Sequence, residues 1–244
     1  MAKPTDCSSG FWMESVNTLA MEIAPRVGLS TAVLDMEHGG GMTASGADSM
    51  ILVGQSLGLR VLVRVANGSR VAVQHALDSG ANGVIIPQID SAGEAAHASR
   101  FCKYPPFGAR GIGYGRTMYD GIGADFIEIE NQRTECWIMI ETAAALDAAG
   151  EIAALPCVDG LFVGPADLSL ARGRGLYADT EADREDHSRV ADAARAAGKL
   201  WGMPAPTAPM AHFARAEGAS LVVVADDVTA LRRGFEAALA DTAS

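Results

Sequence analysis

The chain has 244 residues, of which 49% are hydrophobic and 20% charged, a balance typical of a globular rather than a disordered protein. Lys and Arg number 19 against 30 Asp and Glu. The resulting net charge of −11 argues against nucleic acid or an anionic membrane surface as the main partner. The apolar runs are too short for a membrane span, and the N-terminal stretch lacks the apolar core of a secretory signal.

Short β-branched runs alternate with alanine-rich helical stretches, in units of about thirty residues. The predicted strands cover residues 8–13, 30–36, 59–65, 83–87, 136–140, 160–163, 199–204 and 220–225. The predicted helices cover residues 16–26, 46–57, 70–79, 91–102, 143–155, 183–197, 209–217 and 229–241. Eight such units predict a single-domain (β/α)8 TIM barrel over residues 1–244, with 226–244 as the C-terminal helical segment. The chain lacks a GxGxxG motif after the first strand and a GxxxxGK[ST] motif, which argues against a nucleotide-binding open sheet.

Two glycine-rich segments interrupt this alternation and are predicted to be loops. Residues 103–123 hold six glycines and two prolines, and a second such segment runs from the strand at 160–163 to Gly175. Long loops inside compact domains are usually functional. We expect Arg110 and Arg116 on the first loop either to contact substrate or a neighbouring subunit, or to be solvated.

The positions of the cysteines and histidines indicate the cellular compartment and limit the kinds of metal site that are expected. The cysteines at 7, 102, 136 and 157 form no CxxC pair, so we expect free thiols in a reducing compartment and a cytoplasmic protein. The histidines form no HxH or HExxH pair, so a zinc site of the familiar kinds is unsupported.

Polar residues follow several predicted strands, where a barrel carries its chemistry. Asp35 lies at the end of the second strand, followed by Glu37 and His38, while Arg64 lies at the end of the third and Glu141 follows the fifth. Asp167 comes after the sixth, in the turn Gly164, Pro165, Ala166, Asp167, whose backbone amides suit a carboxylate or a phosphate. This concentration predicts a site for an anionic substrate.

Glu141 and Asp167 are the candidate metal ligands. Glu141 follows four apolar residues of a buried strand, where an ionised carboxylate is costly unless a cation balances it. Two carboxylates on neighbouring strands, with water and substrate oxygens, suit Mg²⁺ or Mn²⁺. The alternative is that Glu141 is a first-turn residue favoured by the helix dipole.

Arg64 and His38 are the candidate catalytic residues. Asp35 lies three residues before His38, close enough to orient an imidazole for proton transfer, although a capping Asp and an exposed loop His would give the same spacing. The guanidinium of Arg64 could pair with a substrate carboxylate or a developing oxyanion, or form a structural ion pair with one of these acids.

Six segments together resemble the HpcH/HpaI aldolase family, the class II pyruvate aldolases. They are LDMEHG (34–39), VRV (63–65), ALDSGANGVIIP (76–87), YPPFGARGIG (104–113), MIET (139–142) and VDGLFVGPADLS (158–169). The resemblance runs in order from about residue 30 to 230. It implies a (β/α)8 barrel that uses a divalent metal (Mg²⁺, Mn²⁺ or Co²⁺) to make a pyruvate enolate for reversible aldol addition to an aldehyde.

The resemblance also assigns roles residue by residue. Glu141 and Asp167 match the metal ligands, Arg64 the enolate-stabilising guanidinium, and His38 the catalytic imidazole with Asp35 as its partner. The amides of Ala166 and Asp167, in the turn from Gly164 and Pro165, match those that hold the pyruvate carboxylate. Asp78 matches an acidic residue that reaches into the neighbouring subunit's site. The family's hexamers, built from dimers that exchange C-terminal helices, imply a homo-oligomer, trimeric or hexameric.

One residue departs from the family's pattern. Many members carry Gln two residues before the metal-binding Glu, whereas this chain has Met139, on the same face of the strand as Glu141. We therefore keep open a relative that uses the enolate for decarboxylation or another C–C bond formation, and a CoA-thioester lyase of the citrate lyase β-like type. A barrel that binds 2-oxo acids without turnover is the non-enzymatic alternative.

Overall fold

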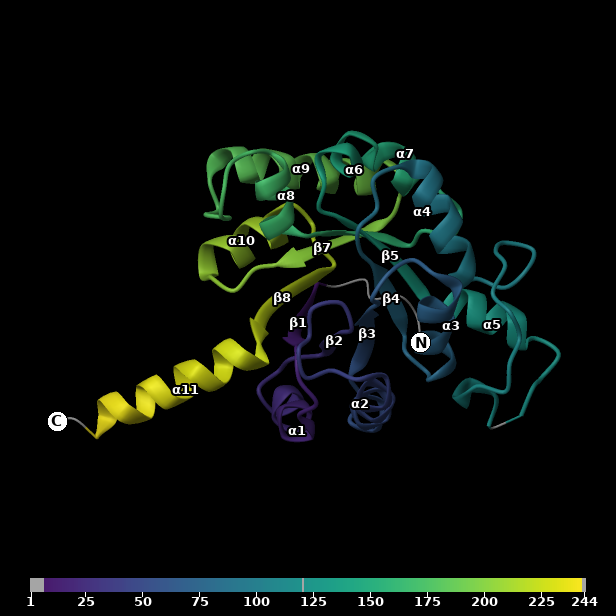
Figure 1. Cartoon of the computed structure of the whole chain (residues 1–244), viewed down its shortest axis with the longest axis horizontal. Helices are drawn as coiled ribbons and strands as arrows, with labels where there is room; N and C mark the ends of the chain where they lie inside the picture. Colours follow the sequence, from purple (N-terminus) through teal and green to yellow (C-terminus); the bar gives the residue numbers. More distant parts are fainter. Residues whose placement is uncertain (1–6, 120, 243–244) are drawn as a thin grey trace.

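The computed structural model describes residues 7–119 and 121–242, and over these ranges the chain forms eight parallel strands that close into a barrel in sequence order (Figure 1). The strands are β1 (Ser8–Met13), β2 (Thr31–Asp35), β3 (Arg60–Arg64), β4 (Gly83–Ile86), β5 (Glu135–Ile140), β6 (Gly160–Val163), β7 (Leu200–Pro204) and β8 (Leu221–Asp226). Each strand pairs with the next, and β1 pairs with β8. The predicted (β/α)8 TIM barrel is confirmed.

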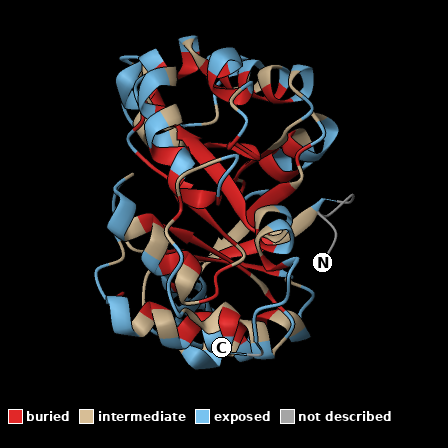
Figure 2. Cartoon of the chain, turned by 90° about the vertical axis from the view of Figure 1, so that its right-hand side faces the viewer, coloured by how far each residue is buried: buried red, intermediate tan, exposed pale blue. Residues whose placement is uncertain are grey.

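The helices surround the barrel and expose their outer faces, while the strands are buried (Figure 2). They are α1 (Thr18–Arg26), α2 (Ala44–Ser56), α3 (Arg70–Asp78), α4 (Ala92–Ser99), η1 (Arg100–Cys102), η2 (Arg116–Met118), α5 (Phe126–Arg133), α6 (Ala143–Asp147), α7 (Ala149–Ala153), α8 (Pro165–Ala171), α9 (Glu181–Ala196), α10 (Ala208–Ala216) and α11 (Asp227–Asp241). Side-chain caps start many of them, such as Thr43 before α2 and the Thr180–Asp183 capping box of α9.

The glycine-rich segments hold more helix than the sequence analysis predicts. The second loop contains α8, which begins with Pro165 at its first position and carries Asp167 in its first turn, both favourable there. Helix α5 lies in a stretch for which no helix is predicted, and the helix predicted over 143–155 is split into α6 and α7 at Ala148. Glycine content therefore masked α8, whereas the α5 sequence holds no glycine.

Strand alternation decides which side chains enter the barrel. The interior cluster consists of Val33, Leu62, Ile85, Trp137, Met139, Phe162, Leu221 and Val223. Two residues beyond Val33, Leu62 and Met139 come Asp35, Arg64 and Glu141, in phase with these interior positions. The pleat therefore directs three charged side chains into the mouth of the barrel, at the carboxyl ends of the strands.

Helix α11 leaves the barrel directly after β8 and extends away from it, with the C-terminus at its far end (Figure 1). Asp227 is the buried residue of this helix, while Leu231, Phe235 and Leu239 are exposed by 50%, 73% and 74%. The last turns of α11 thus lack the packing that an apolar stripe normally receives. In the part of the chain that the structure describes, no helix is long and apolar enough to cross a membrane.

Candidate active site

Arg64 is fixed at the mouth of the barrel by two carboxylates and a tryptophan. Its Nε donates to Asp35 Oδ1 at 2.9 Å, and Nη2 contacts Asp35 Oδ2. Nη1 lies 3.2 Å from Glu37 Oε2, and the guanidinium carbon lies 4.9 Å from the centre of the Trp12 ring. Because Asp35 and Arg64 are register partners on β2 and β3, the pair is built into the sheet.

The Asp35 carboxylate binds Arg64 and backbone amides, and not the imidazole of His38. Its carboxylate accepts hydrogen bonds from Trp12 Nε1 at 3.1 Å and from the backbone amides of Glu37 and His38 at 3.0 and 3.1 Å. Burial alone would raise the pKa of Asp35, but the hydrogen bonds and charge of Arg64, with that from Trp12, hold it below its ordinary value. The partnership expected between Asp35 and the His38 side chain is therefore corrected.

His38 lies in the turn after β2 with an exposed side chain. Its Nε2 lies 3.8 Å from Glu37 Oε1, which makes Glu37 the acid next to the imidazole. Burial raises the pKa of Glu37, against the lowering effect of Arg64 and His38. The DxxH spacing identified the turn, but Glu37, one of the two residues between Asp35 and His38, supplies the contact.

Glu141 is a buried carboxylate with little compensation. It is 1% exposed, and Oε1 accepts a hydrogen bond of 2.6 Å from the backbone amide of Gln88. Gln88 has a φ of 57°, uncommon for a side chain of this kind, and this conformation presents its amide to Glu141. Burial raises the pKa of Glu141, as do the charges of Glu37 and Asp167, and the hydrogen bond from Gln88 offsets this only in part.

Of these groups, Arg64 and Glu141 line a cavity of about 330 Å³, whereas Asp35 and His38 are not among its lining residues. Arg64, Glu141 and the turn 164–167 line one part, and Trp12, Glu14, Pro204, Pro206 and Asp226 line another. Met139 and Phe162 close it from inside the barrel. The structure therefore brings Arg64, Glu141, Gly164, Pro165, Ala166 and Asp167 together in one hollow, with Asp35 beneath Arg64.

The donor set suits a hard cation with a partly open coordination sphere. Among the described residues no group of three or more His, Cys, Asp or Glu side chains could hold a metal ion. Glu141 and Asp167 both line the cavity, and these two carboxylates are the candidate protein ligands. Two carboxylates leave positions for water and substrate oxygens, as Mg²⁺ requires. The buried, poorly compensated charge of Glu141 is what a divalent cation would balance.

Asp78 lies outside this cavity. It ends α3, on the side of the barrel where β4 begins, and Arg110 Nη2 donates to its Oδ1 at 2.8 Å. Arg110 is 3% exposed and also lies 3.4 Å from Glu130 Oε2, so this loop arginine is an anchor of the loop, neither solvated nor at the cavity. Asp78 could therefore act in catalysis only if it reached the active site of another subunit.

Trp12, Glu14 and the backbone amide of Gln88 belong to the site without having been predicted from the sequence. Gly10, Trp12 and Glu14 alternate inward along and just beyond β1, so the period of two that identified Arg64 would have found them. Gln88 acts through its backbone, for which the sequence carries no side-chain signal.

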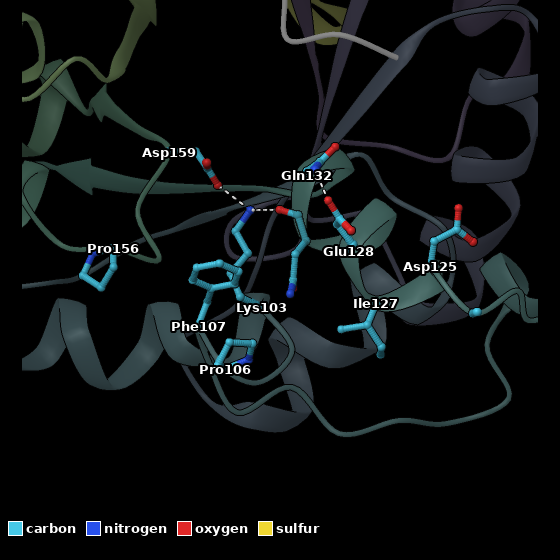
Figure 3. Close-up of a pocket in the computed structure, with 11 residues that line it drawn as sticks. Lys103, Pro106, Phe107, Asp125, Ile127, Glu128, Gln132, Pro156 and Asp159 are labelled. Carbon is cyan, nitrogen blue, oxygen red and sulfur yellow. Dashed lines mark hydrogen bonds and ion pairs between the residues drawn. The ribbon is translucent and has the colours of Figure 1, made fainter.

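A second cavity, of about 780 Å³, lies at the other end of the barrel, beside the starts of β5 and β6 (Figure 3). Figure 3 shows Lys103 reaching toward Asp159; Nζ lies 2.8 Å from Asp159 Oδ2, 2.9 Å from the Asn131 carbonyl, and contacts the Thr134 carbonyl. The charge of Lys103 is balanced by these contacts. The smaller cavity lies at the carboxyl ends of the strands, where a barrel carries its chemistry, and is therefore the candidate active site.

Comparison with known proteins shows the family of the chain. The model of the HpcH/HpaI aldolase/citrate lyase family matches residues 8–234. The chain is 30% identical to the 4-hydroxy-2-oxovalerate aldolase of Rhodococcus jostii (strain RHA1), over 92% of this chain and 87% of that protein. It is 32% identical to the hydroxypyruvate/pyruvate aldolase of Paraburkholderia phytofirmans, over 99% and 95%. A family member from Burkholderia cenocepacia J2315 superposes with a TM-score of 0.89 at 30% identity, over 98% and 95% of the two chains.

Proposed function

Because the chain belongs to the HpcH/HpaI aldolase/citrate lyase family, a family of carbon–carbon lyases, we propose that it is a metal-dependent aldolase. It would cleave a 4-hydroxy-2-oxo acid reversibly into pyruvate, or a related 2-oxo acid, and an aldehyde. The observation that carries this proposal is the buried Glu141 carboxylate, which shares one cavity with Asp167 and the anchored Arg64. The names of the relatives support an aldolase that acts on small 2-oxo acids.

Glu141 and Asp167 would hold the cation, Mg²⁺, Mn²⁺ or Co²⁺. When bound, a divalent cation supplies Lewis-acid stabilisation of negative charge on a keto oxygen. The amides of Ala166 and Asp167, in the first turn of α8 after Gly164 and Pro165, would bind the carboxylate of the 2-oxo acid.

Arg64 stabilises the negative charge that develops on the enolate oxygen. Its guanidinium is held from two sides by Asp35 and Glu37, and from its face by Trp12, so little reorganisation is needed as that charge appears. An interaction that strengthens as charge develops lowers the barrier rather than merely binding substrate.

His38 is the group we assign to the proton of the 4-hydroxyl. In the cleavage direction this proton must leave as the C3–C4 bond breaks, and an imidazole next to Glu37 accepts it directly or through a water molecule. We assign Asp78 to the neighbouring subunit's site.

The assembly we propose is a homo-oligomer, a trimer or a hexamer, with α11 exchanged between subunits. Phe235 and Leu239 of α11, Leu19 of α1 and Val27 directly after α1 are exposed apolar residues, and a cavity of about 560 Å³ lies between the two helices. Exposed stripes of this kind mark protein–protein contacts. We place the enzyme in the cytoplasm, since its cysteines are free thiols.

A coupled lactate dehydrogenase assay tests the activity. The purified enzyme with Mg²⁺, Mn²⁺ or Co²⁺ should release pyruvate from a panel of 4-hydroxy-2-oxo acids, and Glu141→Gln should not. Failure with every substrate and metal would contradict the proposal. Binding of pyruvate in a calorimeter without turnover would instead support a binding barrel.

A second candidate function follows from Met139. This side chain is 2% exposed and lies at the cavity, where it offers a thioether and no hydrogen-bond donor to substrate. An enzyme that decarboxylates oxaloacetate through the same enolate would tolerate this loss of polarity. Product analysis with oxaloacetate and with citramalyl-CoA separates the decarboxylase and the CoA-thioester lyase from the aldolase.

A further inference from the structure

The cavity has two walls of different chemistry. Arg64, Glu141 and Asp167, with the first amides of α8, form the wall at which the proposed function places the 2-oxo acid. The cavity is also lined by Glu14, Pro204, Pro206, Ala225 and Asp226, which come from the carboxyl ends of β1, β7 and β8. We call these five residues the acceptor wall, because the aldehyde must approach the enolate from the side that the metal ligands leave open.

The acceptor wall offers almost nothing that binds an anion. Pro204 and Pro206 have no backbone N–H, and the amide of Ala205 between them already donates to the Val223 carbonyl at 2.7 Å. Among the described residues that line the cavity, Arg64 is the cationic side chain, and it is bonded to Asp35 and Glu37. A carboxylate or phosphate on the aldehyde would therefore meet no donor at this wall.

Glu14 is the acceptor-wall carboxylate with free oxygens. Its backbone amide donates to Asp227 Oδ1 at 3.0 Å, which fixes the residue, while within the described residues its carboxylate accepts no hydrogen bond and joins no ion pair. Asp226, by contrast, caps α11 by accepting from the amide of Thr229 at 2.7 Å. Burial and the charges of Asp226, Asp227 and Asp35 raise the pKa of Glu14, while the charge of Arg64 lowers it.

These charges make the acceptor wall selective. A second anionic group on the aldehyde would face Glu14 and Asp226 in a partly desolvated hollow, where like charges repel more strongly than in water. A hydroxyl group, in contrast, could donate a hydrogen bond to the Glu14 carboxylate, which accepts none from the described residues of the protein.

We propose that the aldehyde substrate is an uncharged hydroxyaldehyde and that Glu14 selects it, by accepting a hydrogen bond from its hydroxyl and by repelling aldehydes that carry a carboxylate or a phosphate. This inference rests on the proposed aldolase function and names its acceptor class. In the synthetic direction, the enolate carbon of the 2-oxo acid bonds to the aldehyde carbon and the aldehyde oxygen gains one proton. No further reactant is needed.

The test compares acceptors in aldol addition with pyruvate and Mn²⁺. Glycolaldehyde and glyceraldehyde are the hydroxyaldehydes, glyoxylate and glyceraldehyde 3-phosphate the anionic ones, and propionaldehyde the uncharged aldehyde without a hydroxyl. Wild type should favour the hydroxyaldehydes over the anionic group in kcat/KM by at least about tenfold. Glu14→Gln should reduce that ratio by about tenfold, and Glu14→Leu should also bring glycolaldehyde down to the level of propionaldehyde.

The readout is a ratio of two kcat/KM values from one preparation, so a partly folded variant does not distort it. Glu22→Gln, the same substitution at an exposed site on α1, is the matched control and should leave the ratio unchanged. Preference of the wild type for anionic aldehydes, or an unchanged ratio in Glu14→Gln, would overturn the inference.

Solvent deuterium exchange into the methyl group of pyruvate, which needs no aldehyde, separates this inference from the proposed function. Exchange together with a preference for anionic acceptors overturns the role of Glu14 and leaves the aldolase standing. No exchange with any divalent metal overturns the proposed function and the inference together.

Discussion

Replacing Gly164 by Ala should disturb the proposed metal site through one added methyl group. A Cβ at this position would lie 2.7 Å from Glu141 Cβ, 2.9 Å from Glu141 Oε2 and 3.2 Å from Met139 Sδ. The backbone angles of Gly164, φ −98° and ψ 84°, lie on the side of φ that alanine accepts, so the effect is steric. The Glu141 side chain must therefore move away from the added methyl group.

The size of the effect follows from these distances. Ordinary contact begins near 3.4 Å, so the Glu141 side chain must move by about 0.7 Å from its 2.7 Å approach. Overpacking of this kind costs about 1–3 kcal/mol of stability. The hydrogen bond of 2.6 Å from the Gln88 amide would lengthen or break, and disturbance of a ligand's support typically lowers metal affinity by about 10- to 100-fold.

Calorimetric titration with Mn²⁺ and urea unfolding measure the two consequences of Gly164→Ala. Gly150→Ala is the matched control, because a Cβ there meets nothing within 4 Å and lies in α7, where Ala is favoured by up to about 1 kcal/mol. An Mn²⁺ affinity in Gly164→Ala equal to that of Gly150→Ala would refute the placement of Glu141 as a ligand.

Other substitutions test separate parts of the account. Arg64→Ala should lower kcat by at least about 100-fold in steady-state kinetics, because a fixed charge at the enolate oxygen is lost; a change confined to KM would mean that Arg64 only binds substrate. Met139→Gln should raise kcat/KM for cleavage of 4-hydroxy-2-oxo acids, and unchanged or lower activity would mean that Met139 does not tune the site. His187 is buried, and burial lowers its pKa to about 4, below the 6.5 of an unfolded chain. The folded state therefore resists its protonation, so stability should be full above pH 6.5 and fall by about 3 kcal/mol as the pH drops from 6.5 to 4. Urea unfolding of His187→Phe should show a flatter dependence over this window than the exposed control His212→Phe, and equal slopes would contradict the assignment.

The barrel could be predicted from the sequence because each strand is a short apolar run with its own turn signals. The polar residues after such runs, Arg64 and Glu141 among them, lie at the mouth because the pleat places them in phase with interior residues. Burial of these charges is visible in the sequence as a charged residue directly after a continuous apolar strand.

The pairings among those residues could not be predicted in the same way. Asp35 lies three residues from His38 but 29 from Arg64, and sheet register, not sequence spacing, decides the partner. Helix α8 was missed because its Gly-Pro start resembles a turn, although proline at a first helical position is also a start signal. Local composition thus located the site, while its contacts depended on tertiary structure.

The most direct test of the central claim is deuterium exchange into the methyl group of pyruvate, followed by proton NMR in D₂O. We predict that pyruvate loses its methyl signal when it is incubated with the wild type and either Mg²⁺ or Mn²⁺, the Mn²⁺ being removed after catalysis. Chelation with EDTA before pyruvate is added should stop this loss. Glu141→Gln and Asp167→Asn should abolish the loss as well. Exchange that persists in Glu141→Gln or in EDTA, or no exchange in the wild type with any divalent metal, would contradict an enolate formed at a metal site of Glu141 and Asp167.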